Sequence, residues 1–197
     1  MSSSKRASTA PAGPKPPTSI SSSAVISDAT SIVGTNHVTI GDNTILHPRV
    51  KIDSTYATVA IGSFCIISER SVVGLRSADT SDMGASEFRE GRISGITVGN
   101  GVSIEAGAAV EANSIGDGCI VEVNAKIGRG AIMGKHCKIG PLCEVKAGEV
   151  LPDFTVIYGT GQRRTDRSGV EDLRMTTMKR HVEVLRRLIP TNLARWQ

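Results

Sequence analysis

Histidine is the residue type in this sequence with the widest possible chemistry, because it can act as a general base and can bind zinc. The chain of 197 residues contains four histidines: His37, His47, His136 and His181. A catalytic zinc needs three protein ligands and an open fourth position. No two of these histidines form a closely spaced pair. The sequence therefore predicts no metal site, no cofactor and no catalytic set, and leaves a single histidine as the only candidate base.

The four cysteines, Cys65, Cys119, Cys137 and Cys143, suggest metal binding or disulfides at first sight. None belongs to a C-x-x-C pair, and each lies four residues after an aliphatic residue. A free cysteine in such a position behaves as a small hydrophobic residue. We therefore expect four inward-facing thiols, which fits a reducing compartment.

The composition disfavours several functional classes. Aromatic residues make up 3% of the chain, too few for a module that stacks nucleic-acid bases. The sequence has neither an apolar run long enough to span a membrane nor a secretory signal, so we expect no membrane insertion. The net charge of +4 is uneven, because residues 1–19 carry +3, residues 20–160 carry −4 and residues 161–197 carry +5. Basic ends favour an acidic protein surface over nucleic acid as the partner.

An internal repeat predicts the fold, because aliphatic residues recur every six positions. The twenty positions are Ile20, Ile26, Ile32, Ile40, Leu46, Ile52, Ile61, Ile67, Val73, Val98, Ile104, Val110, Ile115, Val121, Ile127, Met133, Ile139, Val145, Leu151 and Ile157. Such hexapeptides are typical of a parallel β-helix, in which each repeat is a short strand plus a corner and three repeats make one triangular coil. The chain is therefore expected to be all-β, with about seven coils, the last incomplete, and a height of roughly 30 Å.

Two further patterns refine this expectation. Glycine often follows the aliphatic residue, as at Gly41 and Gly116, and we expect it to supply a positive φ at a tight corner. Small residues usually stand four positions after the aliphatic one, as at Ala125 and Ser114. Every departure from the six-residue step falls after the third repeat of a coil, so the irregular connections should leave one corner of the prism. His47 and His136 are then about four coils, or roughly 19 Å, apart.

The segments outside the repeats differ in character. Residues 1–19 are basic and rich in proline and serine, and we expect a disordered tail. Residues 20–160 form the β-helix, with a long polar corner loop over 74–97 whose only aromatic residue is Phe88. Residues 161–197 should form a basic linker and an amphipathic helix packed along the prism, begun by a capping box of Ser168 and Glu171. This helix either simply covers one prism face or also binds a partner.

Three families with hexapeptide repeats offer functional hypotheses. Hexapeptide acyltransferases use a histidine base near a trimer interface, which would assign that role to His136. Gamma-class carbonic anhydrases bind zinc through three histidines, and their closely spaced pair is absent here. The stretches VTIGDNTILHPRVKI (38–52), LPDFTVIYG (151–159) and LRRLIPTN (185–192) instead resemble the dynactin subunit 6 family. This resemblance covers about residues 20–192 and implies a left-handed β-helix.

The resemblance also implies a non-catalytic role in the cytoplasm, associated with the cytoskeleton. Members of that family pair with a second β-helical subunit at the pointed end of dynactin, beside an actin-related protein and other pointed-end subunits, and serve dynein-driven transport and, indirectly, cargo adaptors. An uncapped first coil or a flat prism face would suit docking. The candidate interface residues are Ile20, Ile26, Phe88, Arg180, Arg186 and Arg187.

Overall fold

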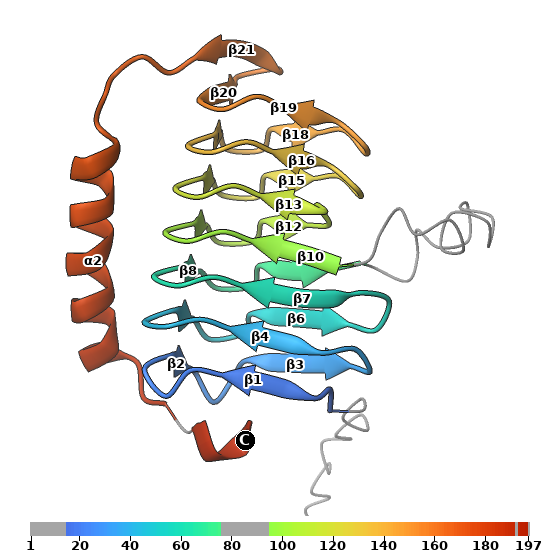
Figure 1. The fold of residues 1–197 in the computed structure, drawn as a ribbon, viewed down its shortest axis with the longest axis vertical. Coiled ribbons are helices and arrows are strands. Elements are labelled where there is room, and N and C mark those ends of the chain that lie inside the picture. The colour runs from blue at the N-terminus through green and yellow to red at the C-terminus, as the bar shows by residue number, and fades with distance from the viewer. Residues whose placement is uncertain (1–14, 76–94, 192, 197) are drawn as a thin grey trace, which may run out of the picture.

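The computed structural model describes residues 15–75, 95–191 and 193–196 of the chain. Its strands are short and almost entirely parallel, and they stack into three sheets that form the sides of a triangular left-handed β-helix (Figure 1). The seven-stranded sheet is called sheet 1, the eight-stranded sheet is sheet 2 and the six-stranded sheet is sheet 3. The β-helix therefore has six full coils and a seventh that lacks its third side, as the repeat predicts.

The strand bounds follow the hexapeptides. Sheet 1 contains β1 (Thr18–Ile20), β4 (Val38–Ile40), β7 (Thr58–Ile61), β10 (Gly95–Val98), β13 (Ser114–Ile115), β16 (Ile132–Met133) and β19 (Val150–Leu151). Sheet 2 contains β2 (Val25–Ile26), β5 (Ile45–Leu46), β8 (Ile66–Ile67), β11 (Ser103–Ile104), β14 (Ile120–Val121), β17 (Lys138–Ile139), β20 (Thr155–Tyr158) and the antiparallel β21 (Gln162–Thr165). Sheet 3 contains β3 (Ser31–Gly34), β6 (Lys51–Ser54), β9 (Val72–Gly74), β12 (Ala109–Val110), β15 (Lys126–Ile127) and β18 (Glu144–Val145).

The core is a stack of the repeated aliphatic residues. In sheet 1, for example, Ile115 lies in register between Val98 and Met133, and all three are buried. The connections that depart from six residues all join sheet 3 to sheet 1, so they leave one corner, as expected. Most described small residues four positions after the aliphatic one are buried, for example Ala125, whereas Ser114 lies on the outer face of β13. The connection from Val110 to Ile115 is one residue short, which places Ser114 just before the core residue.

Glycine is required after the aliphatic residue for a different reason from the one expected. Gly41 and Gly116 do not have a positive φ. A Cβ on Gly116 would stand 2.6 Å from the backbone of Gly134, because the next coil passes directly against it. The positive φ falls two residues later, for example at Gly118 and His136. Glycine at the first position therefore permits close stacking of coils, and the left-handed backbone conformation belongs to the third residue after the aliphatic one.

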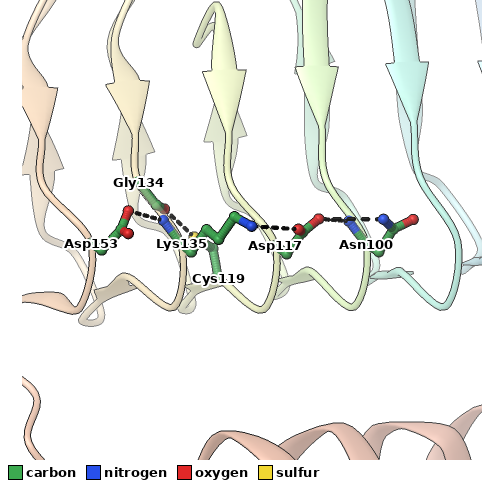
Figure 2. A network of polar contacts seen from close by, with 6 residues as sticks. All are labelled: Asn100, Asp117, Cys119, Gly134, Lys135 and Asp153. Atoms are coloured by element: carbon green, nitrogen blue, oxygen red, sulfur yellow. Dashed lines mark hydrogen bonds and ion pairs between the residues drawn. The ribbon is translucent and has the colours of Figure 1, made fainter.

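A ladder of polar side chains runs along the corner between sheets 1 and 2 (Figure 2). Asp117 Oδ1 accepts hydrogen bonds from the backbone N–H of Asn100 at 2.8 Å and from its side-chain amide at 3.3 Å. Its other oxygen lies 3.6 Å from Lys135 Nζ. The Lys135 N–H donates in turn to Asp153 Oδ1 at 2.8 Å. These side chains satisfy corner N–H groups that the strand ladders leave unpaired.

One long helix, α2 (Glu171–Leu188), stands beside the prism and runs along its axis (Figure 1). The expected capping box is wrong. Val170 occupies the N-cap position and makes no side-chain cap bond. The chain makes its turn at Gly169, where φ is +63°, so Ser168 lies outside the helix, and its N–H donates instead to Asp166 Oδ1. Within the described residues, no helix is both long and apolar enough to cross a membrane.

The first coil is capped by the end of the chain, which corrects the expectation of an uncapped first coil. The 3-10 helix η2 (Leu193–Arg195) lies beneath β1 (Figure 1), and Trp196 is 8% exposed and packs into the core. Its backbone carbonyl accepts a hydrogen bond from Thr18 Oγ1 at 2.6 Å. At the other end, Arg163 of β21 forms an ion pair with Glu149, between β18 and β19.

Candidate interaction surface

Helix α2 covers the outer face of sheet 2 over its first coils. Val182 and Leu185 pack against the outward side chains of Val25, Ile45 and Ile66, and this small second core is separate from the interior of the prism. Arg186 Nη1 also donates to Asn43 Oδ1 at 2.6 Å. The expectation that the helix covers one prism face is confirmed for the carboxyl-terminal half of α2.

The amino-terminal half of α2 stands further from the sheet and leaves a groove of about 490 Å³. Its walls are mainly apolar, with Ile120 on the sheet and Met175 and Met178 on the helix. Three of the four histidines, His47, His136 and His181, line it. His47 and His136 lie on coils four steps apart in sheet 2, as predicted. Among the described residues, no three His, Cys, Asp or Glu side chains gather closely enough to hold a metal ion.

Two of the histidines in the groove, His47 and His136, contact neighbours from their own chain. His47 Nδ1 lies 2.8 Å from Glu69 Oε1. The His136 ring stacks on Phe154 with 5.3 Å between ring centroids, and it occupies the space where a Cβ on residue 118 would stand. His136 therefore lines the groove under the helix of its own chain.

The cysteines lie inside the prism, as predicted. Cys65, Cys119, Cys137 and Cys143 are all buried and unbridged. Each thiol is directed at a backbone carbonyl of the next coil, for example Cys119 Sγ at Gly134 O, 3.0 Å away (Figure 2). Burial raises the pKa of Cys65 to about 11. Such thiols are packing residues and have little nucleophilic character.

An exposed stripe runs along the outer side of α2. Leu173, Val184 and Leu188 are 64%, 54% and 69% exposed, and Leu173 also borders the groove. At 3.6 residues per turn, these three side chains fall within about 60° of one another. Arg180 and Arg187 lie on the same side and are exposed. Neither forms an ion pair with another described residue. We call these five residues the α2 stripe.

The other candidate interface residues are placed differently. Ile26 is fully buried in the core, so a partner cannot contact its side chain. Ile20 is half-buried and packs against the core that also contains Trp196. Phe88 lies outside the described residues. Arg186 is exposed, but its guanidinium already holds α2 against the second coil.

A buried carboxylate fixes the start of α2. Asp166 accepts hydrogen bonds from the Ser168 N–H at 3.1 Å and from Arg174 Nη2 at 2.8 Å. Interaction with the Ser168 side chain, together with the bonds from Arg174 and from the Ser168 N–H, lowers the pKa of Asp166 to about 2. The Asp166 N–H donates to the carbonyl of Phe154, which joins this segment to the last coil. The position of the α2 stripe is therefore set at both ends of the helix.

Comparison with known proteins identifies the family. Dynactin subunit 6 of Nematostella vectensis is 31% identical over 128 residues, which are 64% of this chain and 67% of that protein. The chain belongs to the dynactin subunit 6 family. Dynactin subunit 6 of Xenopus tropicalis is also 31% identical, over 62% of this chain and 59% of the relative, so the match spans less than two thirds of that protein. Dynactin subunit 6 of Dictyostelium discoideum is 26% identical over 178 residues. No family profile matches the chain.

Solved structures agree on the fold of this dynactin subunit 6 relative. A hexapeptide transferase family protein from Anaplasma phagocytophilum superposes with a TM-score of 0.71 at 14% identity, over 89% of this chain and 97% of the other. A putative acetyltransferase from Bacillus cereus gives a TM-score of 0.57 at 18% identity, over 87% and 90% of the two chains. At these identities the likeness concerns architecture alone. The predicted hexapeptide β-helix is confirmed.

Proposed function

We propose that the chain is a non-catalytic structural subunit of the pointed-end complex of dynactin. In this role it pairs with a second β-helical subunit, adjoins an actin-related protein, and supports dynein-driven transport and cargo binding in the cytoplasm. The observation that carries the proposal is the 31% identity to Dynactin subunit 6 over 128 residues. Two other relatives are matched over only about 60% of their chains. The role of this chain in the complex is therefore inferred from its family membership.

The placement of His136 supports a non-catalytic role. A hexapeptide acyltransferase requires a histidine base at a boundary between subunits, where the acceptor and the acyl donor meet. Here the ring is stacked on Phe154 and lines a groove roofed by α2 of the same chain. The purified chain should therefore show no transfer from acetyl-CoA. Turnover that is lost in His136→Ala would instead support the acyltransferase alternative.

The α2 stripe supplies a surface suited to a protein partner. Three exposed aliphatic side chains on a helix form an apolar strip that gains free energy when water is removed from it. Arg180 and Arg187 lie among them, and arginine pairs well with carboxylates at the edge of an interface. The complementary partner surface is apolar with acidic residues at its edge.

Charge reversal on the stripe tests this proposal. The variant Arg180→Glu/Arg187→Glu should reduce recovery of the actin-related protein and the second β-helical subunit with the tagged chain by about tenfold or more. The variant Arg164→Glu/Arg167→Glu is the matched control, because it changes the net charge equally at exposed residues outside the stripe. Equal recovery with both variants would contradict the assignment of the stripe, and recovery of neither protein with the wild-type chain would contradict the proposed function.

A further inference from the structure

The groove between α2 and sheet 2 is long and narrow. It runs beside five coils of the prism, from His47 in the second coil to His136 in the sixth, a span of roughly 19 Å. Its volume of about 490 Å³ lies in the range of small-molecule sites. Divided by that span, the volume corresponds to a mean cross-section of about 26 Å².

This cross-section excludes larger occupants. An α-helix with its side chains is about 10 Å wide and would need a cross-section of about 80 Å². An extended peptide is narrower, but its backbone N–H and C=O groups need partners. The floor of the groove is the face of sheet 2 with Ile66 of β8 and Ile120 of β14, and both strands are already paired on their two sides. The dimensions and walls therefore suit a single hydrocarbon chain.

The helix side of the groove can adapt to such a chain. Met175 and Met178 line it, and methionine is the most flexible of the apolar side chains. The Met175 side chain reaches across to the prism, because a Cβ on Gly101 would stand 2.4 Å from its Cε. Both thioethers can shift to admit a ligand, and removal of their surface and that of the ligand from water favours binding.

A buried nitrogen of one lining residue has no partner. His47 Nδ1 lies 2.8 Å from Glu69 Oε1, and because a carboxylate only accepts hydrogen bonds, Nδ1 carries a proton. In the neutral ring Nε2 is then an acceptor, and it is buried without a hydrogen-bond partner in the described part of the chain. An unpaired buried acceptor is costly. A hydroxyl group on the ligand would donate to Nε2 and remove this cost.

The charges along the groove disfavour an anionic ligand. Arg174 is the only lysine or arginine among the lining residues, and its guanidinium already donates to Asp166. Glu105 and Glu171 also line the groove and would repel a carboxylate or a phosphate. The Glu105 carboxylate in turn accepts a hydrogen bond from Ser103 Oγ at 3.0 Å, so it does not require a cationic partner. A charged head group would also lose its hydration at a buried position.

We propose that the groove binds one neutral amphiphile of the long-chain alcohol class. The hydrocarbon chain lies along the groove between Ile120 and Met175, and the hydroxyl group donates to His47 Nε2. The bound chain fills the space that separates the amino-terminal half of α2 from sheet 2. This binding activity goes beyond the proposed function and uses neither of its partner proteins, so the two are tested separately.

Three probes with the same chain length test the ligand class: 1-decanol, its methyl ether and decanoate. The full-length chain is labelled with [methyl-¹³C]methionine and titrated with each probe by NMR. We expect 1-decanol to shift the Met175 and Met178 methyl signals to saturation at one molecule per chain. Met133 is buried in the prism and should not respond. The methyl ether, which has no donor, and the anionic decanoate should each bind about tenfold more weakly.

Two substitutions locate the site. Ile120→Lys introduces a charge into the groove and should fold, because Lys138 occupies the same outward position in the next coil. It should weaken 1-decanol binding by about tenfold or more. Ile132→Lys is the matched control, because Ile132 faces outward on sheet 1 and is 43% exposed. It should bind like the wild type. If Ile120→Lys does not fold, Met175→Lys on the helix side replaces it, with Met178 as the reporter.

His47→Phe tests the hydrogen bond to the head group. It should lower the affinity for 1-decanol to that for the methyl ether and leave the affinity for the ether unchanged within about twofold. Equal affinities for alcohol and ether in the wild type, or tighter binding of decanoate, would overturn the inference. Shifts that do not saturate, that persist in Ile120→Lys, or that are absent altogether would also overturn it. None of these results would affect the proposed function, which depends on recovery of the partner proteins.

Discussion

The buried carboxylate of Asp166 accepts a hydrogen bond from the guanidinium of Arg174 at 2.8 Å and so ties the last coil of the prism to the first turns of α2. The two residues are eight positions apart, and the turn at Gly169 lies between them. The bond sets the angle at which the helix leaves the prism, and with it the orientation of the α2 stripe.

The contribution of Asp166 should depend on pH in a defined direction. Its pKa in the folded chain is about 2, below the ordinary value of 3.8. A carboxyl with a lowered folded-state pKa stabilises the fold above its unfolded pKa, and this contribution is lost as the pH falls through the folded value. Asp166→Asn should cost about 2 kcal/mol at pH 7, and the difference from wild type should disappear between pH 4 and pH 2. Denaturant unfolding at several pH values measures this.

Asp172→Asn is the control for that series. Asp172 is an exposed carboxylate in the first turn of α2, so its loss should cost less than about 1 kcal/mol. A loss for Asp166→Asn no larger than this would show that the Asp166–Arg174 bond does not hold the helix.

Coil stacking should be intolerant of any side chain at Gly116. Gly116→Ala places a Cβ against the backbone of Gly134, and neither backbone can move without breaking the sheet ladder. We expect a loss of about 1–3 kcal/mol in thermal or denaturant unfolding. Gly148→Asn is the contrast, because Gly148 has a φ of +69° and open space around it, and Asn43 already adopts this conformation at an equivalent corner. Equal losses for the two variants would contradict the close-approach explanation.

Trp196 should stabilise the first coil more than the rest of the prism. Trp196→Ala removes the side chain that covers the end of the core, at a cost of about 3 kcal/mol. Because each coil contacts only its neighbours, the effect should be local. Hydrogen exchange should accelerate in β1 and β2 and remain slow in β14 and β17. Trp196→Phe should retain most of the protection, and uniform loss across all coils in Trp196→Ala would contradict an end cap.

The four thiols should be unreactive in the folded chain. All four are buried, so an alkylating reagent cannot reach the sulfur atoms, and burial also raises the pKa of Cys65 to about 11. Mass spectrometry should find no alkylated cysteine in the native chain and four in denaturant. Rapid modification of any one cysteine without unfolding would show that it does not face the core.

The pairing of strands in the prism could be predicted from the sequence because it follows from the six-residue repeat. Ile115 and Met133, for example, pair in neighbouring coils because they occupy the same position of the repeat, one coil apart. The reason for glycine at Gly116 could not be read this way, because the collision that excludes a Cβ comes from the next coil. The presence of glycine was informative, but its cause required the stacked structure.

The surfaces were harder to predict than the core. Leu173 and Leu188 fit a helical apolar repeat, but α2 turns them to solvent because Arg174 and Arg186 fix its rotation at either end. The contact of Trp196 with the first coil could not be predicted from a local pattern, because nearly the whole chain separates the two. Which residues share an outer face of a sheet becomes visible only once the register is known.

The native mass and composition of the tagged chain, purified gently from its own cells, test the central claim most directly. The account predicts recovery in a megadalton particle that contains actin-related proteins and a second β-helical chain. A free homotrimer without these partners would contradict it, and zinc content and acetyl-CoA turnover would then become the next quantities to measure.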